Sequence, residues 1–245
     1  WTPSELDGHN RNESATFAQI KAQGKACLPK SFDPAEKDPA AYVDRCSVYD
    51  PRRGHNKTTD VVINRKHTSR AYSLGETLKT CIYGRVVCGV KLEMKSDQWE
   101  FTQTPVAIKL LSKETILRRQ HEESAVEDPE TEIAAMQLAG REATKLKSNT
   151  VIKTHDVLAD DENIYVVMDF CEGRLFDVIA SNGPLPEPEA RVYFLQILDG
   201  LSHVHRAGIC HRDLSLENVM IKNGCACIID FGLSLRIPVE PRRLR

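Results

Sequence analysis

His211-Arg212-Asp213-Leu214-Ser215-Leu216-Glu217-Asn218 and, seventeen residues after Asp213, Asp230-Phe231-Gly232 decide how this sequence is interpreted. The first stretch follows a segment with the apolar spacing of a long helix, and the second follows an apolar run typical of a short strand. Upstream, Val106-Ala107-Ile108-Lys109 ends a β-branched run that predicts a further strand. Each short match is weak alone, so the interpretation depends on their order and on these structural contexts.

The second half of the chain has the pattern of helices. Residues 187–207 predict a long helix that Gly208 ends, because their apolar side chains recur at helical spacing. A shorter helix is predicted over Leu175–Ala180, and two very short strands, Val219–Ile221 and Cys227–Ile229, flank the turn Asn223-Gly224. This half therefore predicts a mainly helical region.

The preceding segment predicts five strands. They are Tyr72–Leu78 and Arg85–Met94, joined as a hairpin by residues 79–84, then Thr104–Leu111, and a second hairpin of Val151–Leu158 and Asn163–Asp169. A short helix is expected over Lys113–Glu122. Asp128-Pro129 predicts the start of another helix, which is expected to end near Gly140. Strands followed by helices indicate an α+β protein with two lobes.

Residues 1–70 are rich in Pro, Asp, Asn, Lys and Arg and show weak apolar periodicity. We expect a mostly irregular extension there, with a short helix near Ser14–Ala22.

Composition excludes several classes of protein. Thirty-three Lys and Arg against 35 Asp and Glu leave a net charge of −2, which does not favour a nucleic-acid or membrane-surface binder. No apolar run reaches the roughly 18 residues that a spanning helix needs. The eight cysteines include no C-x-x-C pair, so reduced, buried thiols and a cytoplasmic location are expected.

The three motifs, in this order, resemble the eukaryotic protein kinase family from Tyr72 to Arg245 and are most similar to its calcium/calmodulin-dependent kinase-like serine/threonine group. The resemblance implies a two-lobed kinase fold with a five-stranded antiparallel small-lobe sheet and an incomplete helical large lobe. It divides the chain into an irregular extension (1–70), a small lobe with the hinge (71–171) and a partial large lobe (172–245).

The resemblance also implies the roles of the motif residues. Lys109 would bind ATP phosphates and be held by a carboxylate, with Glu132 as the best match and Glu130 as the alternative. Asp213 would accept the proton of a substrate hydroxyl, and Asn218 and Asp230 would ligate Mg²⁺. The remaining ATP-binding residues implied in this way are Leu78, Gly84, Val86, Ala107, Met168, Asp169, Cys171 and Met220.

The sequence departs from the family pattern at three places. Lys79 and Cys81 stand where the first two glycines of the phosphate-binding loop are expected, and Ser215 replaces the usual lysine of the catalytic loop. The chain ends 13 residues after Gly232 without an Ala-Pro-Glu element, as a fragment or a truncated product would.

The expected function is ATP- and Mg²⁺-dependent protein serine/threonine phosphorylation, with the 245 residues alone marginally stable and inactive toward peptide. The alternative is a pseudokinase that binds nucleotide or acts as a scaffold, which the eroded loop and Ser215 favour. A small-molecule kinase is a third reading, which Arg212 and the intact Asp-Phe-Gly disfavour. The regulatory partner cannot be inferred from these residues.

Overall fold

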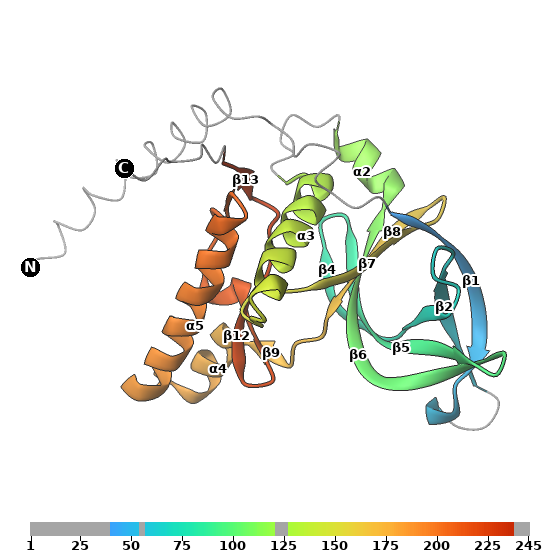
Figure 1. Cartoon of the computed structure of the whole chain (residues 1–245), viewed down its shortest axis with the longest axis horizontal. Coiled ribbons are helices and arrows are strands. Elements are labelled where there is room, and N and C mark those ends of the chain that lie inside the picture. The colour runs from blue at the N-terminus through green and yellow to red at the C-terminus, as the bar shows by residue number, and fades with distance from the viewer. Residues whose placement is uncertain (1–39, 54–56, 121–126, 238–245) are drawn as a thin grey trace, which may run out of the picture.

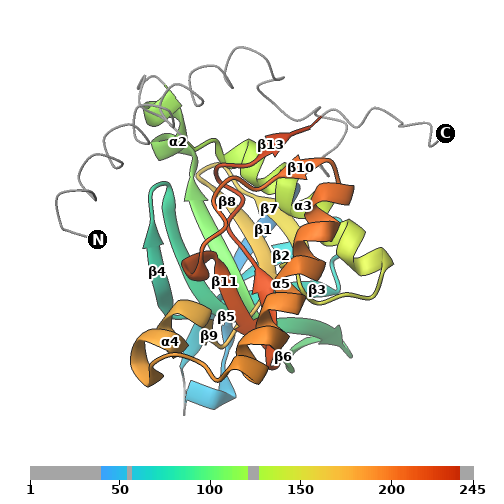
Figure 2. The same ribbon diagram turned by 90° about the vertical axis from the view of Figure 1, so that its left-hand side faces the viewer.

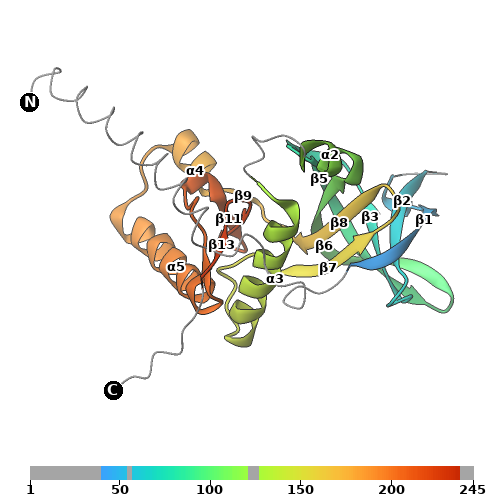
Figure 3. The same cartoon turned by 90° about the horizontal axis from the view of Figure 1, so that it is seen from above.

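The computed structural model describes residues 40–53, 57–120 and 127–237, and these form two lobes. A β-rich lobe contains strands β1 to β8, and a second lobe contains helices α4 (Leu175–Asn182) and α5 (Glu187–Arg206). Helix α3 (Pro129–Lys145) lies between them, as Figures 1 and 3 show. The predicted α+β, two-lobed architecture is confirmed in this part of the chain.

Eight strands form the small-lobe sheet, in the order β3-β2-β1-β7-β8-β6-β5-β4. Strand β3 also pairs with β5, so that seven strands close into a ring and β4 lies outside it. All pairings are antiparallel except that of β1 with β7. The strands are β1 (Ala41–Tyr49), β2 (Thr58–Asn64), β3 (Arg70–Leu74), β4 (Thr77–Cys81), β5 (Gly84–Lys95), β6 (Gln98–Ser112), β7 (Thr154–Ala159) and β8 (Asn163–Asp169).

The prediction of an irregular extension was wrong for residues 41–49 and 58–64, and the prediction of five strands was therefore too low. Val43 and Val62 of the extension are buried in one cluster with Ile108 and Leu158 of the later strands. Burial of β-branched and apolar side chains against an existing sheet stabilises these added strands. Residues 51–53 form a 3₁₀ turn, and the helix predicted near residues 14–22 lies outside the described residues.

The strand predicted over 72–78 is divided between β3 and β4. Gly75 lies between them, its amide donates to the carbonyl of Cys88 at 2.8 Å, and a Cβ at this position would meet that carbonyl oxygen at 2.7 Å. This close approach bends the chain. As a result β3 pairs with β2 and β5, whereas β4 forms the predicted hairpin with β5 across a turn that is shorter than expected.

Helix α3 begins as predicted and ends later. The Asp128 side chain accepts hydrogen bonds from the Glu130 amide at 3.1 Å and the Thr131 hydroxyl at 2.6 Å, which caps the helix start. Gly140 does not end the helix, which continues to Lys145. Glycine at this position instead lets α3 pack closely on the next segment, since a Cβ there would meet the Ile152 carbonyl oxygen at 3.0 Å. Helix α2 covers Lys113–Gln120, and the last two residues of the predicted helix lie outside the described residues.

The large lobe places α5 against a small sheet, as Figure 2 shows. That sheet contains β9 (Gly173–Arg174), β11 (Val219–Lys222) and β12 (Cys225–Ile228), while β10 (Ile209–Cys210) pairs with β13 (Leu235–Arg236). A 3₁₀ turn covers Leu216–Asn218. Among the described residues, no helix has the length and apolar character needed to cross a membrane.

Candidate active site

Lys109 of β6 forms a buried ion pair with α3. Its Nζ lies 2.5 Å from Oε1 of Glu132, and both side chains are largely buried, 15% and 7% exposed. Burial opposes the charged form of Lys109, but the neighbouring Glu132 and Asp230 outweigh it and raise the pKa of Lys109. Of the two carboxylates considered from the sequence, the structure brings Glu132 to the lysine, whereas Glu130 is exposed.

Asp213 and Asn218 are joined directly in the catalytic-loop segment. The Asn218 Nδ2 donates to the Asp213 carbonyl oxygen at 2.8 Å and to its Oδ2 at 3.0 Å. Arg212 has a positive φ of 65° and its Nε donates to the carbonyl of Leu233 at 2.6 Å. The two bonds from Asn218 hold Asp213 in place within this loop.

The Asp230-Phe231-Gly232 segment packs behind this loop. Phe231 is fully buried, and its ring lies 4.9 Å from the ring of His211, which itself hydrogen-bonds the Ile229 carbonyl oxygen at 2.9 Å. Asp230 has a positive φ of 63°, a strained conformation for a non-glycine residue. Phe231 anchors this segment, and Asp230 lies close enough to Lys109 for its charge to raise the pKa of that lysine.

The side chains of Asn218 and Asp230 fit a hard divalent cation. The amide nitrogen of Asn218 is the atom engaged with Asp213, so its carbonyl oxygen remains for a metal ion. The Asp230 Oδ1 accepts only a long bond, 3.3 Å, from the Gly232 amide. A carboxylate and an amide oxygen are ligands that Mg²⁺ accepts, with water and phosphate completing its coordination.

Strand register places the residues implied for adenine binding on one face of the sheet. Val86 pairs with Lys109, and Ala107, two residues before Lys109, pairs with Met168. Paired residues and residues two apart point to the same side of a sheet, so these four side chains share a face. Met220 lies on β11 of the large-lobe sheet, and Leu78 lies at a bulge in β4 and is 52% exposed.

Lys79 and Cys81 lie on this same face. Lys79 pairs with Val86 and Cys81 pairs with Gly84, two positions apart on both strands. Cys81 is half-buried, which raises the pKa of its thiol, and it lies close enough to Lys109 and Asp230 to sense their charges. The two side chains therefore lie on the face of the sheet that carries Lys109, where glycines would leave the backbone uncovered.

Gly84 has a packing reason that the sequence did not reveal. A Cβ at Gly84 would meet the carbonyl oxygen of Leu110 at 2.0 Å, so only glycine allows β5 to lie this close to β6. This glycine is required by the sheet whether or not it contacts phosphate.

Asp169 has a second role that sequence reasoning missed. Its carboxylate accepts a hydrogen bond from Nζ of Lys222 at 2.5 Å and contacts Nε2 of His155 at 2.8 Å. Burial raises the pKa of Asp169, but these two partners outweigh burial and hold it below the ordinary value. Cys171, two residues later, packs against the buried cluster that contains Cys227 of β12. The hinge is thereby attached to β7 and to the large lobe.

Glu127 was also missed. Its backbone carbonyl accepts from the Tyr83 hydroxyl at 2.7 Å, and its side chain would be in contact with a Cβ on Gly232 at 3.3 Å. Burial and the nearby Asp230 and Glu132 raise the pKa of Glu127. Glu127 is thus a third carboxylate close to Asp230 and Glu132. The only sequence signal was an acidic residue just before the Asp128 cap.

The comparisons with known proteins match this geometry. The profile of the protein kinase domain matches residues 93–242. CBL-interacting protein kinase 33 of Oryza sativa subsp. japonica is 34% identical over 165 residues, covering 66% of this chain and 32% of the relative. CBL-interacting serine/threonine-protein kinase 8 of Arabidopsis thaliana is 34% identical over 165 residues, covering 66% and 33%. This chain spans about a third of the length of these relatives.

The matched region begins after the segment in which Lys79 and Cys81 stand in place of glycines. It contains Lys109, Glu132, Asp213, Asn218 and Asp230. The names of the relatives agree with the resemblance to the calcium/calmodulin-dependent kinase-like group. The matched profile covers more than half of the sequence, and the chain belongs to the protein kinase domain family.

Proposed function

We propose that this chain supplies the nucleotide site and the catalytic base of an ATP- and Mg²⁺-dependent protein serine/threonine kinase. The observation that carries the proposal is the buried Lys109–Glu132 ion pair beside Asp230. Forming this pair costs the desolvation of two charges. A phosphate anion that binds the same lysine adds a favourable electrostatic interaction, which gives the buried lysine a functional reason. The serine/threonine substrate class follows the names of the relatives.

Each residue has a separate task in this mechanism. Lys109, held by Glu132, binds the α- and β-phosphates. Asp230 and Asn218 would hold Mg²⁺, which when bound neutralises charge on the phosphate oxygens. Asp213, fixed by Asn218, orients the substrate hydroxyl and accepts its proton as the oxygen attacks the γ-phosphorus in line with the departing ADP oxygen.

A nucleotide-binding module without turnover is the second candidate. Lys79 and Cys81 favour this candidate. They lie on the same face of the sheet as Lys109, where their side chains would keep the loop backbone away from phosphate. Ser215 favours it too, because it leaves the γ-phosphate without the usual cation. Asp213 favours the enzyme. A module that only binds nucleotide has no use for a catalytic carboxylate that Asn218 holds in place.

Phosphotransfer by the complete product of the gene distinguishes the two candidates. We expect ³²P transfer from ATP to serine or threonine of a general protein substrate, and loss of at least about a hundredfold in Asp213→Asn. Asp177→Asn, on the exposed surface of α4, is the matched control and should retain activity. Nucleotide binding without transfer in the wild-type protein would favour the second candidate.

The 245 residues alone should bind nucleotide but not phosphorylate peptide, because they contain no Ala-Pro-Glu element after Gly232.

All seven cysteines in the described part of the chain are free thiols, which supports a reducing compartment such as the cytoplasm.

A further inference from the structure

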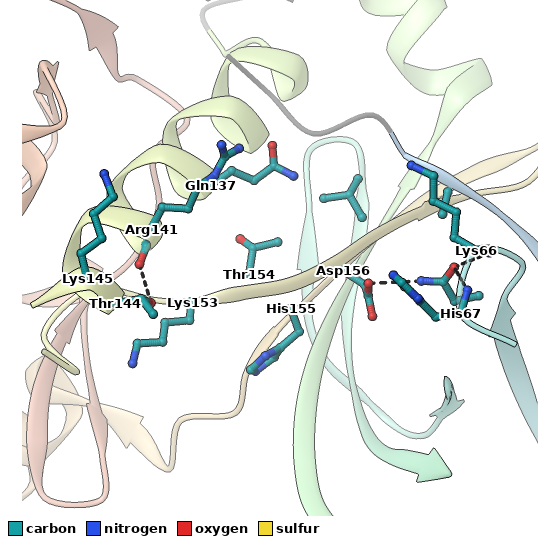
Figure 4. A pocket seen from close by; sticks show the side chains of 14 residues that line it. Lys66, His67, Gln137, Arg141, Thr144, Lys145, Lys153, Thr154, His155 and Asp156 are labelled. Carbon is teal, nitrogen blue, oxygen red and sulfur yellow. Dashed lines mark hydrogen bonds between the residues drawn. The ribbon is translucent and has the colours of Figure 1, made fainter. Parts of the chain in front are cut away.

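A pocket of about 620 Å³ is lined by none of the residues implied in nucleotide binding. Its walls come from the N-terminal extension, from β7 and from the C-terminal half of α3. Figure 4 shows Lys66 and His67 on one side, Arg141 and Lys145 on the other, and Thr154 and the next β7 residues between them. The pocket exists because β1 pairs with β7 and brings the extension beside the helix.

The lining is strongly basic. Four Lys or Arg side chains and two His side chains line the pocket against one carboxylate, that of Asp156. Asp156 is already engaged: it accepts hydrogen bonds from the Tyr72 hydroxyl and from Asn64 Nδ2, and Arg70 lies 3.6 Å away. The carboxylate therefore does little to neutralise the lysines on the two opposite walls.

Other partners reduce this positive charge only in part. Lys145 pairs with Glu142 at 3.1 Å and His155 contacts Asp169 at 2.8 Å, but Lys153 donates to the neutral amide of Asn149 at 3.0 Å. Lys66 is exposed beside the pocket. An excess of cationic donors thus remains around the opening.

The walls also offer neutral donors at fixed places. The Thr154 hydroxyl is buried and has no hydrogen-bond partner among the described residues. Asn64 Oδ1 accepts from the amides of Lys66 at 2.9 Å and His67 at 3.2 Å, which fixes the turn that presents these two side chains. A buried hydroxyl without a partner is unfavourable unless a ligand or water satisfies it.

We propose that this pocket binds a phosphate monoester, carried by a phosphorylated side chain or by a free small molecule. A phosphate group has between one and two negative charges and three acceptor oxygens, which match converging lysines, an arginine and a hydroxyl. The volume lies in the range of roughly 300–1,000 Å³ typical of small-ligand sites.

Helix α3 connects this pocket to the nucleotide site, a step that rests on the proposed function. Gln137 and Arg141 line the pocket on the same helix that carries Glu132. A ligand that joins α3 to the extension and β7 would hold the Lys109–Glu132 pair in place. Binding at one site should then tighten binding at the other by an equal factor.

Calorimetric titration at low ionic strength with phenyl phosphate tests this binding site, because this phosphate monoester has no nucleobase that the nucleotide site could bind. We expect saturable binding that Lys66→Glu with Lys153→Glu weakens by about tenfold or more. Lys57→Glu, in the same extension but outside the pocket, should stay within about twofold. Equal affinity in the double variant, or no saturable binding, would overturn the proposal, and so would loss of binding in Lys109→Met alone.

Two additions keep this test decisive. If the double variant does not fold, as judged by its thermal melt, Lys66→Met keeps the side-chain length and should still weaken binding by about threefold. A phosphoserine peptide that binds more tightly than phenyl phosphate supports a phosphorylated segment as the source, whereas equal affinity supports a free phosphate. ATP affinity that does not change with phenyl phosphate would overturn only the coupling through α3.

Discussion

The ring of small-lobe strands and the outer face of α5 bury their apolar side chains to very different extents. Val62, Leu92 and Ile108 are completely buried in the ring. On α5, four large apolar side chains are 46–59% exposed: Val192, Phe194, Leu195 and Leu198. Complete burial of a large apolar side chain contributes about 1.5–3 kcal/mol, so each of these half-exposed side chains forgoes roughly half of that. The ring is thus a complete core, whereas the described residues leave one face of the large lobe uncovered.

The largest expected effect compares these two regions directly. Ile108→Ala should lower the free energy of unfolding by about 2–5 kcal/mol, because it leaves a cavity in the ring. Leu195→Ala should change it by less than about 0.5 kcal/mol, because little is packed there. Urea unfolding followed by circular dichroism measures both. Similar losses in the two variants would show that the face of α5 is covered in solution.

The second prediction asks whether the extension belongs to this core. Val62→Ala should cost roughly 0.5–3 kcal/mol, because Val62 is buried among strands of the kinase sheet. Thr58→Ala, exposed on the same strand, is the control and should be nearly neutral. If Val62→Ala leaves the unfolding curve unchanged, the extension does not form part of the ring.

The extension is also the element that the sequence analysis missed. Residues 61–63 are Val-Val-Ile, a β-branched run typical of a strand, but charged and proline-rich neighbours obscured it. Strand β1 has a broken alternation in which only Ala41 and Val43 are fully buried. Pairing with β7 across 117 positions stabilises β1, and local patterns cannot report such a distant contact.

The candidate site was more predictable than the fold around it. Lys109, Asp213 and Asp230 stand in short motifs whose spacing is visible in the sequence, and all three lie close enough to Glu127 for their charges to affect its pKa. Glu127 and the side chain of Asp169 were not predictable. Their contacts with Gly232 and Lys222 depend on how loops far apart in the sequence pack together.

A third prediction concerns the large lobe and pH. Burial lowers the pKa of His211 below 6.5, although Asp230, Asp213 and the Ile229 carbonyl act in the opposite sense. As the pH falls, the unfolded state therefore binds this proton before the folded state does. The contribution of neutral His211 to the free energy of unfolding is complete above pH 6.5 and is lost as the pH falls below it. His211 contributes at most about 1.4 kcal/mol per pH unit.

Unfolding free energies measured between pH 7.5 and about pH 5 check this sign. His211→Gln keeps a donor for Ile229 and cannot titrate, so its stability should depend less steeply on pH, whatever its value at pH 7. A variant with the same slope as the wild type would remove His211 as the cause.

The smallest expected effect lies at the boundary of the two lobes. Lys79→Gly with Cys81→Gly should tighten ATP binding by a few-fold, about 1 kcal/mol or less, because the loop backbone could then approach phosphate. Fluorescence titration with a labelled nucleotide measures the change. Thr80→Gly, on the opposite face of β4, should give no gain. Weaker binding in the double variant would mean that the Lys79 charge itself binds phosphate.

The central claim is that Lys109, Asn218 and Asp230 form a metal-dependent nucleotide site, and calorimetric titration of ATP with and without Mg²⁺ tests it most directly. We predict that Mg²⁺ tightens ATP binding to the wild-type chain and that Asp230→Asn abolishes this dependence while the protein stays folded. Lys109→Met should weaken binding in both conditions. Equal ATP affinity with and without Mg²⁺ in the wild-type chain would contradict the assignment of Asp230 and Asn218 as metal ligands.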